Sequence, residues 1–311
     1  MPREQLARRA ALIVNTRSRE GRAEMEAAER LLRARGVQLC SVREVGDPNM
    51  LPRAISEAVA TSVPIVIVGG GDGSLMAAVE HFEASGPALG VLPLGTANSF
   101  ARSLGIPLDL AGAVDVIAHG RPRRIDLGII NGKLYAGCAS MGLAPQIAAT
   151  IPHGLKAWAG RPGYLIWAAV QLARFRAFRL TVEIGAERET LDAVEVRIAN
   201  GPYHAGVKLV DQARLDSGNI VVQAVIGQKR RHILLNWAAH AIGSDRRWRQ
   251  IRQFEAPSIR LETEPALPIS IDGEVLAQTP IVAGVKPGAI LVMAPPPPSR
   301  QTSKQSALTH A

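Results

Sequence analysis

The sequence predicts an α/β domain followed by a mainly antiparallel β domain. Three observations predict this fold class. Short apolar runs alternate with helical segments in the first third of the chain, glycine-rich turns follow two of these runs, and strand-like stretches dominate after about residue 125. We therefore expect a three-layer α/β domain with a largely parallel sheet in residues 1–125 and a β domain in residues 126–288.

The first β–α–β unit is predicted by one apolar run and one helical spacing. Residues 10–14, AALIV, have the composition of a short buried strand that ends at Asn15. Residues 20–35 carry apolar side chains at helical spacing, and Gly36 ends the expected helix. Residues 37–45 follow as the second expected strand.

The next units continue the same alternation. Residues 51–60 are expected to form the second helix, and the fully apolar run 63–68 a strand that is buried on both faces. Residues 75–83 are expected as a helix and residues 88–92 as another short strand. This β-α-β-α-β-α-β order predicts a largely parallel sheet.

The rest of the chain has the texture of an antiparallel β domain. Asn-Gly and Asp-Gly turns separate its apolar stretches. Helical excursions are expected at 163–176 and 229–243, and the polar tail 295–311 is expected to be disordered. The expected strands are 124–130, 133–138, 179–184, 193–199, 219–225, 257–261, 267–271 and 289–293.

Composition narrows the class of protein. Hydrophobic residues make up 47% of the chain and charged residues 20%, which excludes a disordered or fibrous protein. The two cysteines form neither a disulfide framework nor a zinc spacing. The apolar run 10–14 is too short for a signal peptide, and the uncharged stretch 134–155 contains too many glycines and prolines for a membrane span. We therefore expect a cytoplasmic protein.

A glycine-rich turn, GGGDGS, occupies residues 69–74 between a predicted strand and a predicted helix. Glycines allow the backbone to approach an anion closely, and the helix N-terminus adds positive potential, so the turn favours phosphate. The sequence is neither a Walker motif nor Gly-x-Gly-x-x-Gly. Asp72 lies inside the turn, and a carboxylate beside phosphate suits a Mg²⁺ ion between them. The alternative is a plain strand–helix turn with an aspartate near the cap.

A second motif, PLGTANSFAR, occupies residues 93–102 after the next predicted strand. Thr96 and Asn98 offer neutral hydrogen-bonding groups there. Alone, the motif is a helix cap. Beside the first motif it places two loops at the carboxyl edge of one sheet, where α/β proteins bind ligands.

A third motif, IDGE, occupies residues 271–274. Asp272 and Glu274 flank a glycine turn, and alone they fit an ordinary Asp-Gly hairpin. Phosphoryl transfer to a hydroxyl, however, uses one carboxylate as the proton acceptor and another to hold metal.

Together these motifs resemble the catalytic family of diacylglycerol and sphingoid lipid kinases, especially its bacterial diacylglycerol-kinase-like members. Residues 69–74 match the family's Gly-Gly-Asp-Gly-Thr/Ser motif, residues 93–102 its Pro-x-Gly-Thr-x-Asn-Asp-Phe-Ala-Arg motif, and residues 271–274 its Asp-Gly-Glu motif. Asn15 matches the opening Asn-Pro segment and residues 200–203 the middle segment. The resemblance covers nearly the whole chain, with the motifs in the right order.

The resemblance implies a two-domain kinase in which the α/β domain and a C-terminal β-sandwich flank a cleft for ATP and Mg²⁺. Asp72 would serve Mg²⁺ and phosphate positioning, and Glu274, supported by Asp272, would activate a lipid hydroxyl. The strand near 289–294 is a candidate to return to the first domain. The residues implied to bind the nucleotide are Asn15, Gly70, Gly71, Gly73, Ser74, Gly95, Thr96 and Asn98.

The chain also departs from the family pattern. Ser99 stands where the family has an aspartate of the catalytic carboxylate set. The opening Asn-Pro-x-Ser-Gly segment reads NTRSR at residues 15–19. Many relatives have a structural metal site at an Asp-Asp-Gly segment. That segment reads Leu-Asp-Ser-Gly here, which leaves only Asp216 as a candidate ligand of this structural metal.

The net charge is +9, of which +7 lies in residues 126–311. Residues 229–252 combine basic ends with an apolar stripe, a pattern that favours an anionic membrane surface. The alternative is a helix packed on the β domain with solvated arginines.

The sequence thus predicts an ATP- and Mg²⁺-dependent lipid kinase that phosphorylates diacylglycerol or a related lipid alcohol. Three alternatives stay open: a sphingoid-base kinase, a weakly active or non-catalytic lipid- or nucleotide-binding relative, which Ser99 favours, and a sugar or NAD kinase. We expect an anionic membrane surface as a peripheral partner and no nucleic acid, because no recognisable module for one is present. A homodimer is left open.

Overall fold

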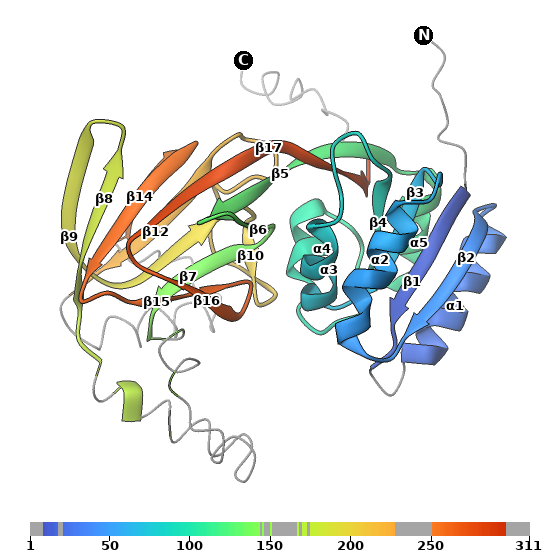
Figure 1. Cartoon of the computed structure of the whole chain (residues 1–311), viewed down its shortest axis with the longest axis horizontal. Coiled ribbons are helices and arrows are strands. Elements are labelled where there is room, and N and C mark those ends of the chain that lie inside the picture. The colour runs from blue at the N-terminus through green and yellow to red at the C-terminus, as the bar shows by residue number, and fades with distance from the viewer. Residues whose placement is uncertain are drawn as a thin grey trace, which may run out of the picture.

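The computed structural model describes residues 9–17, 21–143, 145, 150, 167, 170–172, 175–227 and 251–296. In these residues a 15-stranded mixed sheet runs through both parts of the molecule, with a two-stranded sheet beside it. Figure 1 shows the parallel α/β part at one end and the antiparallel β part at the other. The expected α/β plus β fold class is confirmed.

The N-terminal part is a parallel sheet in the order β4-β3-β1-β2. Its strands are β1 (Arg9–Asn15), β2 (Gln38–Val45), β3 (Ile65–Gly70) and β4 (Ala88–Pro93). All six residues of β3 and of β4 are buried, as expected for inner strands covered on both faces. The carboxyl ends of β3 and β4 therefore meet at one edge of the sheet.

Helices cover both faces of this sheet because right-handed crossovers place successive helices according to the direction of the chain. Helix α1 packs beside α5, and α2 packs beside α3. Helix α5, over Leu110–His119, was not expected. Asp109 is its N-cap and accepts a hydrogen bond from the backbone N–H of Gly112. The helices are α1 (Gly21–Ala34), α2 (Leu51–Val59), α3 (Asp72–Val79), α4 (Ser99–Leu104) and α5 (Leu110–His119), with a 3₁₀ turn, η1 (Pro48–Met50), before α2.

The C-terminal part is an antiparallel β-sandwich. Strands β7, β9, β12 and β15 and strands β8, β14 and β17 contribute side chains to one shared apolar core, separate from that of the α/β part. Its strands are β5 (Arg121–Ile130), β6 (Lys133–Tyr135), β7 (Cys138–Gly142), β8 (Phe178–Ile184), β9 (Glu187–Ala199), β10 (Tyr203–His204), β11 (Val207–Lys208), β12 (Ile220–Ile226), β13 (Ile251–Ala256), β14 (Ser258–Glu264), β15 (Pro268–Ile271), β16 (Glu274–Gln278) and β17 (Ile281–Ala294).

Several details of this part differ from expectation: β10, β11, β13 and β16 were not expected, and β17 begins at Ile281 instead of residue 289. The strand expected at 133–138 is divided into β6, which pairs with β5, and β7, which pairs with β9 and β15. The break falls at Gly137, whose carbonyl accepts from the backbone N–H groups of Asn200 and Gly201 instead of a neighbouring strand. Strand β9 also begins earlier than expected, at Glu187, because an exposed, charged hairpin arm extends it.

Strand β17 belongs to both parts. Its first half pairs with β14 and contributes Ile281 and Ala283 to the sandwich core. Its second half pairs with β4, and Ile290 and Val292 lie in the core of the α/β part. Strand β5 runs along its whole length, so a boundary at residue 125 falls inside a strand shared by both cores.

Several expected segments lie outside the described residues. Of the helix expected at 163–176, the structure describes residues 167, 170–172, 175 and 176, and residues 167 and 170–172 are helical. The helix expected at 229–243 and residues 297–311 of the tail lie outside. None of the helices that the structure describes is long and apolar enough to cross a bilayer.

Candidate functional site

The turn after β3 carries the first glycine motif. Gly71 is the N-cap of α3, which begins at Asp72. A Cβ on Gly70 would lie 2.6 Å from the Ser74 Oγ atom, and Asn15 Nδ2 donates to that oxygen over 2.9 Å. Asn15, at the end of β1, therefore ties the start of α3 to the neighbouring strand. The hydroxyl of Ser74 is already bonded inside the protein.

The turn after β4 carries the second motif and is built around Asn98. This side chain is buried, and its Nδ2 donates to the carbonyls of Pro93 and Gly95 over 3.2 and 2.7 Å. Its Oδ1 accepts from the Gly95 N–H over 2.9 Å. Asn98 also has a φ of 49°, a left-handed conformation that asparagine tolerates better than most residues. Its side chain thus holds the loop from inside.

The two glycine loops touch each other. A Cβ on Gly95 would lie 2.5 Å from the Gly71 Cα atom, so a side chain there would push the loops apart. Gly73 and Thr96 are exposed, and a Cβ on Gly73 would meet nothing within 4 Å. The pair of loops therefore presents open backbone beside the N-terminus of α3, an arrangement that fits a phosphate chain.

Asp72 links the first loop to the second. Its Oδ2 accepts from the Ser99 N–H over 3.0 Å, and its Oδ1 accepts from the Phe100 N–H over 3.1 Å. The carboxylate thereby satisfies two of the free N–H groups at the start of α4. Each oxygen keeps a further lone pair, so Asp72 can still coordinate a cation.

A cavity of about 200 Å³ lies between the two parts of the molecule, beside these loops. Its walls come from α3, α4, the β6–β7 turn, the β10–β11 hairpin and the β15–β16 turn. The lining residues are Asp72, Met76, Ser99, Phe100, Gly137, Tyr203, His204, Ala205, Asp272 and Gly273. The structure thus brings Asp72 and Asp272, 200 residues apart in sequence, to one cavity.

Asp272 is held in the β15–β16 turn with a φ of 47°. Its Oδ1 accepts from the Cys138 N–H over 3.1 Å, and a Cβ on Gly137 would lie 2.4 Å from that oxygen. Burial raises the pKa of Asp272 to about 6, and the nearby Asp72 acts in the same direction against hydrogen bonds from the backbone at residues 136–138. A carboxyl group with this pKa can exchange protons near neutral pH.

Glu274 has a different position. It is exposed at the start of β16 and does not line the cavity that holds Asp272. The carboxylates of the third motif therefore separate into one inside the cavity and one outside it.

Sequence reasoning missed the β10–β11 hairpin as part of the site. Tyr203, His204 and Ala205 all line the cavity. The Ser99 Oγ atom accepts from the Gly206 N–H over 2.9 Å, which ties the hairpin to α4. Burial lowers the pKa of His204, as does the charge of Arg197, and both effects favour the neutral imidazole. A histidine beside an Ala-Gly turn was the signal available in the sequence.

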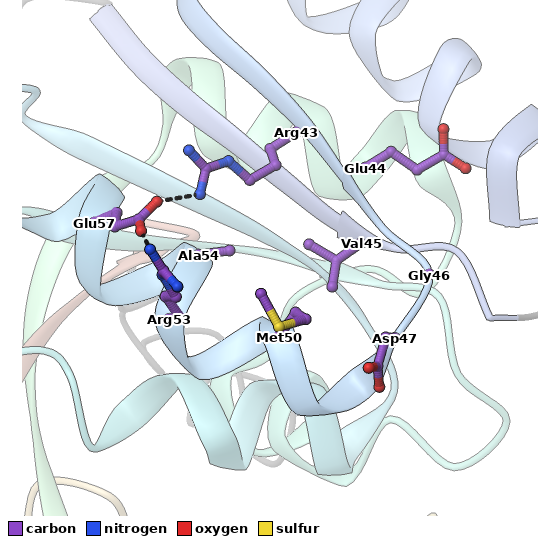
Figure 2. A pocket seen from close by; sticks show the side chains of 9 residues that line it. All are labelled: Arg43, Glu44, Val45, Gly46, Asp47, Met50, Arg53, Ala54 and Glu57. Atoms are coloured by element: carbon purple, nitrogen blue, oxygen red, sulfur yellow. Dashed lines mark hydrogen bonds and ion pairs between the residues drawn. The ribbon is translucent and has the colours of Figure 1, made fainter.

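A second cavity, of about 500 Å³, opens where β2 leads into α2 (Figure 2). In Figure 2 the carboxylate of Glu57 lies between the guanidinium groups of Arg43 and Arg53. Hydrogen bonds from Arg43 first and Arg53 second lower the pKa of Glu57. The N–H of Thr16 donates to the carbonyl of Val45, so this cavity lies at the same sheet edge as the glycine loops.

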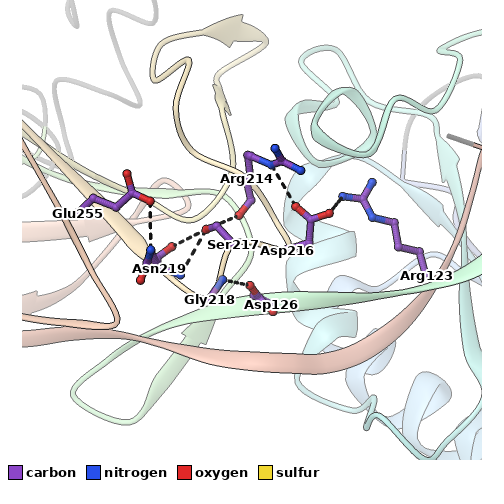
Figure 3. A network of polar contacts seen from close by, with 8 residues as sticks. All are labelled: Arg123, Asp126, Arg214, Asp216, Ser217, Gly218, Asn219 and Glu255. Atoms are coloured by element: carbon purple, nitrogen blue, oxygen red, sulfur yellow. Dashed lines mark hydrogen bonds and ion pairs between the residues drawn. The ribbon is translucent and has the colours of Figure 1, made fainter. Parts of the chain in front are cut away.

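Asp216, the candidate ligand of a structural metal, lies in a polar network in the loop between β11 and β12 (Figure 3). It accepts from Arg123 over 2.7 Å and from Arg214 over 3.3 Å. Burial acts to raise its pKa, but the two arginines outweigh burial and hold the pKa below its ordinary value. Among the described residues, no group of three or more His, Cys, Asp or Glu side chains is placed to hold a metal ion. Two cations already neutralise Asp216.

Asp126 connects three elements in the same network. It is buried, its Oδ2 accepts from the Gly218 N–H and its Oδ1 from the Gly288 N–H, both over 2.7 Å. Its own N–H donates to the carbonyl of Leu215. Asp126 therefore joins β5, the loop before β12 and β17.

Two family models match the chain in sequence order. The diacylglycerol kinase catalytic domain matches residues 9–130, and the YegS C-terminal NAD kinase beta sandwich-like domain matches residues 137–294. The second model alone covers half of the chain. The site described above lies between the two matched regions, with residues from both.

Relatives resemble the chain over nearly its whole length. A protein of Pseudomonas aeruginosa named "Probable lipid kinase YegS-like" is 30% identical, with 91% of this chain and 94% of the relative covered. A protein of the same name from Yersinia enterocolitica is 29% identical, with 92% and 96% covered. A crystal structure of a diacylglycerol kinase from Bacillus anthracis matches with a TM-score of 0.72 at 21% identity, over 93% of this chain and 97% of that one, and so shares the fold.

The two matched domains place the chain in the diacylglycerol kinase class of lipid kinases. More narrowly, the chain belongs to the YegS-like lipid kinase family.

Proposed function

We propose that this chain is an ATP- and Mg²⁺-dependent lipid kinase that phosphorylates the hydroxyl of diacylglycerol or a related lipid alcohol. One observation carries the proposal: the paired glycine loops and the Asp72 and Asp272 carboxylates meet at one cavity between the domains. Loops of this kind cradle phosphates, and facing carboxylates serve metal binding and proton transfer. The names of the relatives support the lipid as acceptor.

The nucleotide is proposed to lie along the two glycine loops. Gly73 and Thr96 present open backbone and a hydroxyl on the exposed side, while Gly70, Gly71 and Gly95 allow the loops to pack closely. Asn15, Ser74 and Asn98 hold the loops by hydrogen bonds within the protein. We therefore assign direct phosphate contact to the first two residues and support of the cradle to the others.

Mg²⁺ is proposed to bind at Asp72. The ion typically takes one or two carboxylates and completes its coordination with phosphate oxygens and water. Asp72 fits this need because the N–H groups of Ser99 and Phe100 fix its carboxylate while leaving lone pairs open. A bound ion would neutralise charge on the phosphates during transfer.

The carboxylates of the third motif are proposed to activate the lipid hydroxyl. Asp272 lines the cavity and has a pKa of about 6, so it is the better placed proton acceptor. Glu274 lies outside that cavity, at the exposed start of β16, where it can assist only at the entrance. This placement favours Asp272 over the sequence-based choice of Glu274.

Peripheral binding to an anionic membrane is proposed as the route to the substrate. The exposed side chains of Val275 and Leu276 follow Gly273, which lines the cavity, so apolar surface adjoins the site. The excess positive charge of residues 126–311 supports attraction to anionic lipid. Replacing Val275 and Leu276 by serine should reduce sedimentation with anionic vesicles, whereas replacing the equally exposed Val282, on β17, should not.

A lipid-panel assay tests the function. The purified chain is given ATP, Mg²⁺ and dispersed lipid alcohols, and the product is identified by mass spectrometry. We expect a lipid phosphomonoester as the product. Asp72→Asn should lower the rate of lipid phosphorylation by about 10³-fold or more, and Asp272→Asn should lower this rate more than Glu274→Gln does. Nucleotide binding without any phosphorylated lipid would rule out the proposal, and equal losses in the last two variants would rule out the preference for Asp272.

A further inference from the structure

We propose that His204 binds the acceptor hydroxyl directly. The β10–β11 hairpin and Ser99 hold His204 in this position. This inference rests on the proposed function and assigns a substrate contact to a residue outside the three sequence motifs.

The hairpin has the geometry of a rigid support. Tyr203 pairs with Lys208 and His204 with Val207, which leaves Ala205 and Gly206 as the two turn residues. Both have positive φ values, 49° and 82°, as in the tight type I′ turn. A two-residue turn of this type fixes the twist of the strands that flank it, and so fixes the position of His204.

The α/β domain holds this hairpin from the opposite side. The Gly206 N–H donates to the Ser99 Oγ atom over 2.9 Å, and a Cβ on Gly206 would lie 3.3 Å from the carbonyl oxygen of Ala97. The turn therefore sits directly on the second glycine loop. Because that loop also contacts the first one, His204 is located relative to the proposed phosphate cradle.

The lining and the volume of the cavity limit which part of a lipid can enter it. Two carboxylates and a neutral imidazole face it, and no lysine or arginine lines it among the residues that the structure describes. The volume of about 200 Å³ is below that of a typical ligand pocket, so only the alcohol end of a lipid fits.

A neutral imidazole supplies what the carboxylates lack. Ionised carboxylates only accept hydrogen bonds, whereas neutral imidazole also has an N–H that donates. The alcohol oxygen can accept from His204, give its proton to Asp272 and keep one lone pair for phosphorus. In the transfer, the bond from that oxygen to the γ-phosphorus forms, the bond from this phosphorus to the β–γ bridging oxygen breaks, and the nucleoside diphosphate leaves. His204 keeps its proton throughout.

Steady-state kinetics of variants tests the assignment. His204→Ala should raise the KM for the lipid alcohol about tenfold or more with nucleotide affinity unchanged, because one hydrogen bond to the acceptor is lost. His204→Gln keeps an N–H donor and should recover part of the affinity. Ser99→Ala should move KM in the same direction by less. His119→Ala, on the exposed side of α5, is the matched control and should change nothing.

The outcomes separate the two proposals. An unchanged KM in both His204 variants, or an equal fall in nucleotide affinity, overturns the role of His204 while the kinase activity stands. If His204→Ala does not fold, His204→Gln and Ser99→Ala decide alone. No phosphorylation of any lipid by the unaltered chain overturns both proposals.

Discussion

Asp272 combines burial with a position in the cavity, and this gives the site a pH dependence. Its pKa of about 6 lies above the ordinary value, so the carboxylate takes up a proton as the pH falls through 6. We expect the kcat at pH 5 to be about tenfold below its value above pH 7. The measurement is a pH profile of kcat with saturating substrates.

The same shift has the opposite effect on folding. The folded chain binds this proton more tightly than the unfolded chain, so the contribution of Asp272 to the free energy of unfolding rises as the pH falls. The fall in kcat at low pH is therefore not explained by a loss of stability when Asp272 takes up its proton. In Asp272→Asn the residual rate should be flat between pH 5 and 7; a profile that keeps the same acid limb would assign it to another group.

Two glycines of the proposed phosphate cradle have different roles: Gly95 packs the two loops together, and Gly73 faces the open side where the ligand would bind. A Cβ on Gly95 would lie 2.5 Å from the backbone of Gly71, whereas a Cβ on Gly73 would meet nothing within 4 Å. Gly95→Ala should lower the free energy of unfolding by about 1–3 kcal/mol and weaken nucleotide binding. Gly73→Ala should keep full stability, because alanine suits a helix, yet bind nucleotide about tenfold more weakly.

Denaturant unfolding and calorimetric titration with nucleotide measure both effects. If Gly73→Ala binds nucleotide as tightly as the unaltered chain, the phosphates do not contact this residue. If Gly95→Ala is as stable as the unaltered chain, the loops do not pack as described.

At the scale of elements, Asp126 joins three of them by accepting hydrogen bonds. Asp126→Ala removes the acceptor for the N–H groups of Gly218 and Gly288 and should lower the free energy of unfolding by about 3 kcal/mol. Asp216→Ala is the matched control: its arginine partners are partly exposed, so the loss should be below about 1 kcal/mol. Urea unfolding measures both, and equal losses would show that the Asp126 contacts contribute little.

The glycine loops were predictable from the sequence because their causes are local. An apolar run followed by GGGDGS can only place its glycines at a strand end. The role of Asn98 was not predictable in this way, since its amide turns back to Pro93 and Gly95 instead of a ligand. An asparagine side chain suits either role equally, holding a loop or binding a ligand.

The place of the β10–β11 hairpin depends on packing between distant parts of the chain. Among the described strands the hairpin pairs only with itself, and a hydrogen bond from Gly206 to Ser99, over 100 residues earlier, holds it beside the cavity. The position of Glu274 has a local cause: Asp272 lies in the β15–β16 turn with a φ of 47°, whereas Glu274 begins β16, and only Asp272 lines the cavity. The residue types of the IDGE motif do not specify which of its two carboxylates enters the cavity.

At the scale of the whole molecule, the two domains are expected to unfold together. Strand β17 has its first half in the sandwich core and its second half in the α/β core, so loss of either half disrupts both. Ile290→Ala, at a fully buried position, should lower stability by about 2–5 kcal/mol in a single transition.

Two probes test this cooperativity. Trp167 packs against the apolar core of the sandwich, so its fluorescence reports on the second domain. Far-UV circular dichroism includes the five helices before residue 120. Coincident curves are expected for the unaltered chain and for Ile290→Ala, and two separated transitions would contradict a shared unit.

The shared strand also sets the order of events on the ribosome. Strand β4 ends at residue 93 and so emerges before the second domain, but the strand that covers its outer edge ends at residue 294. Until then the nascent α/β half carries an apolar, unpaired strand edge through the synthesis of the whole second half. We expect this protein to rely on chaperones that protect such edges, and to complete its first domain last.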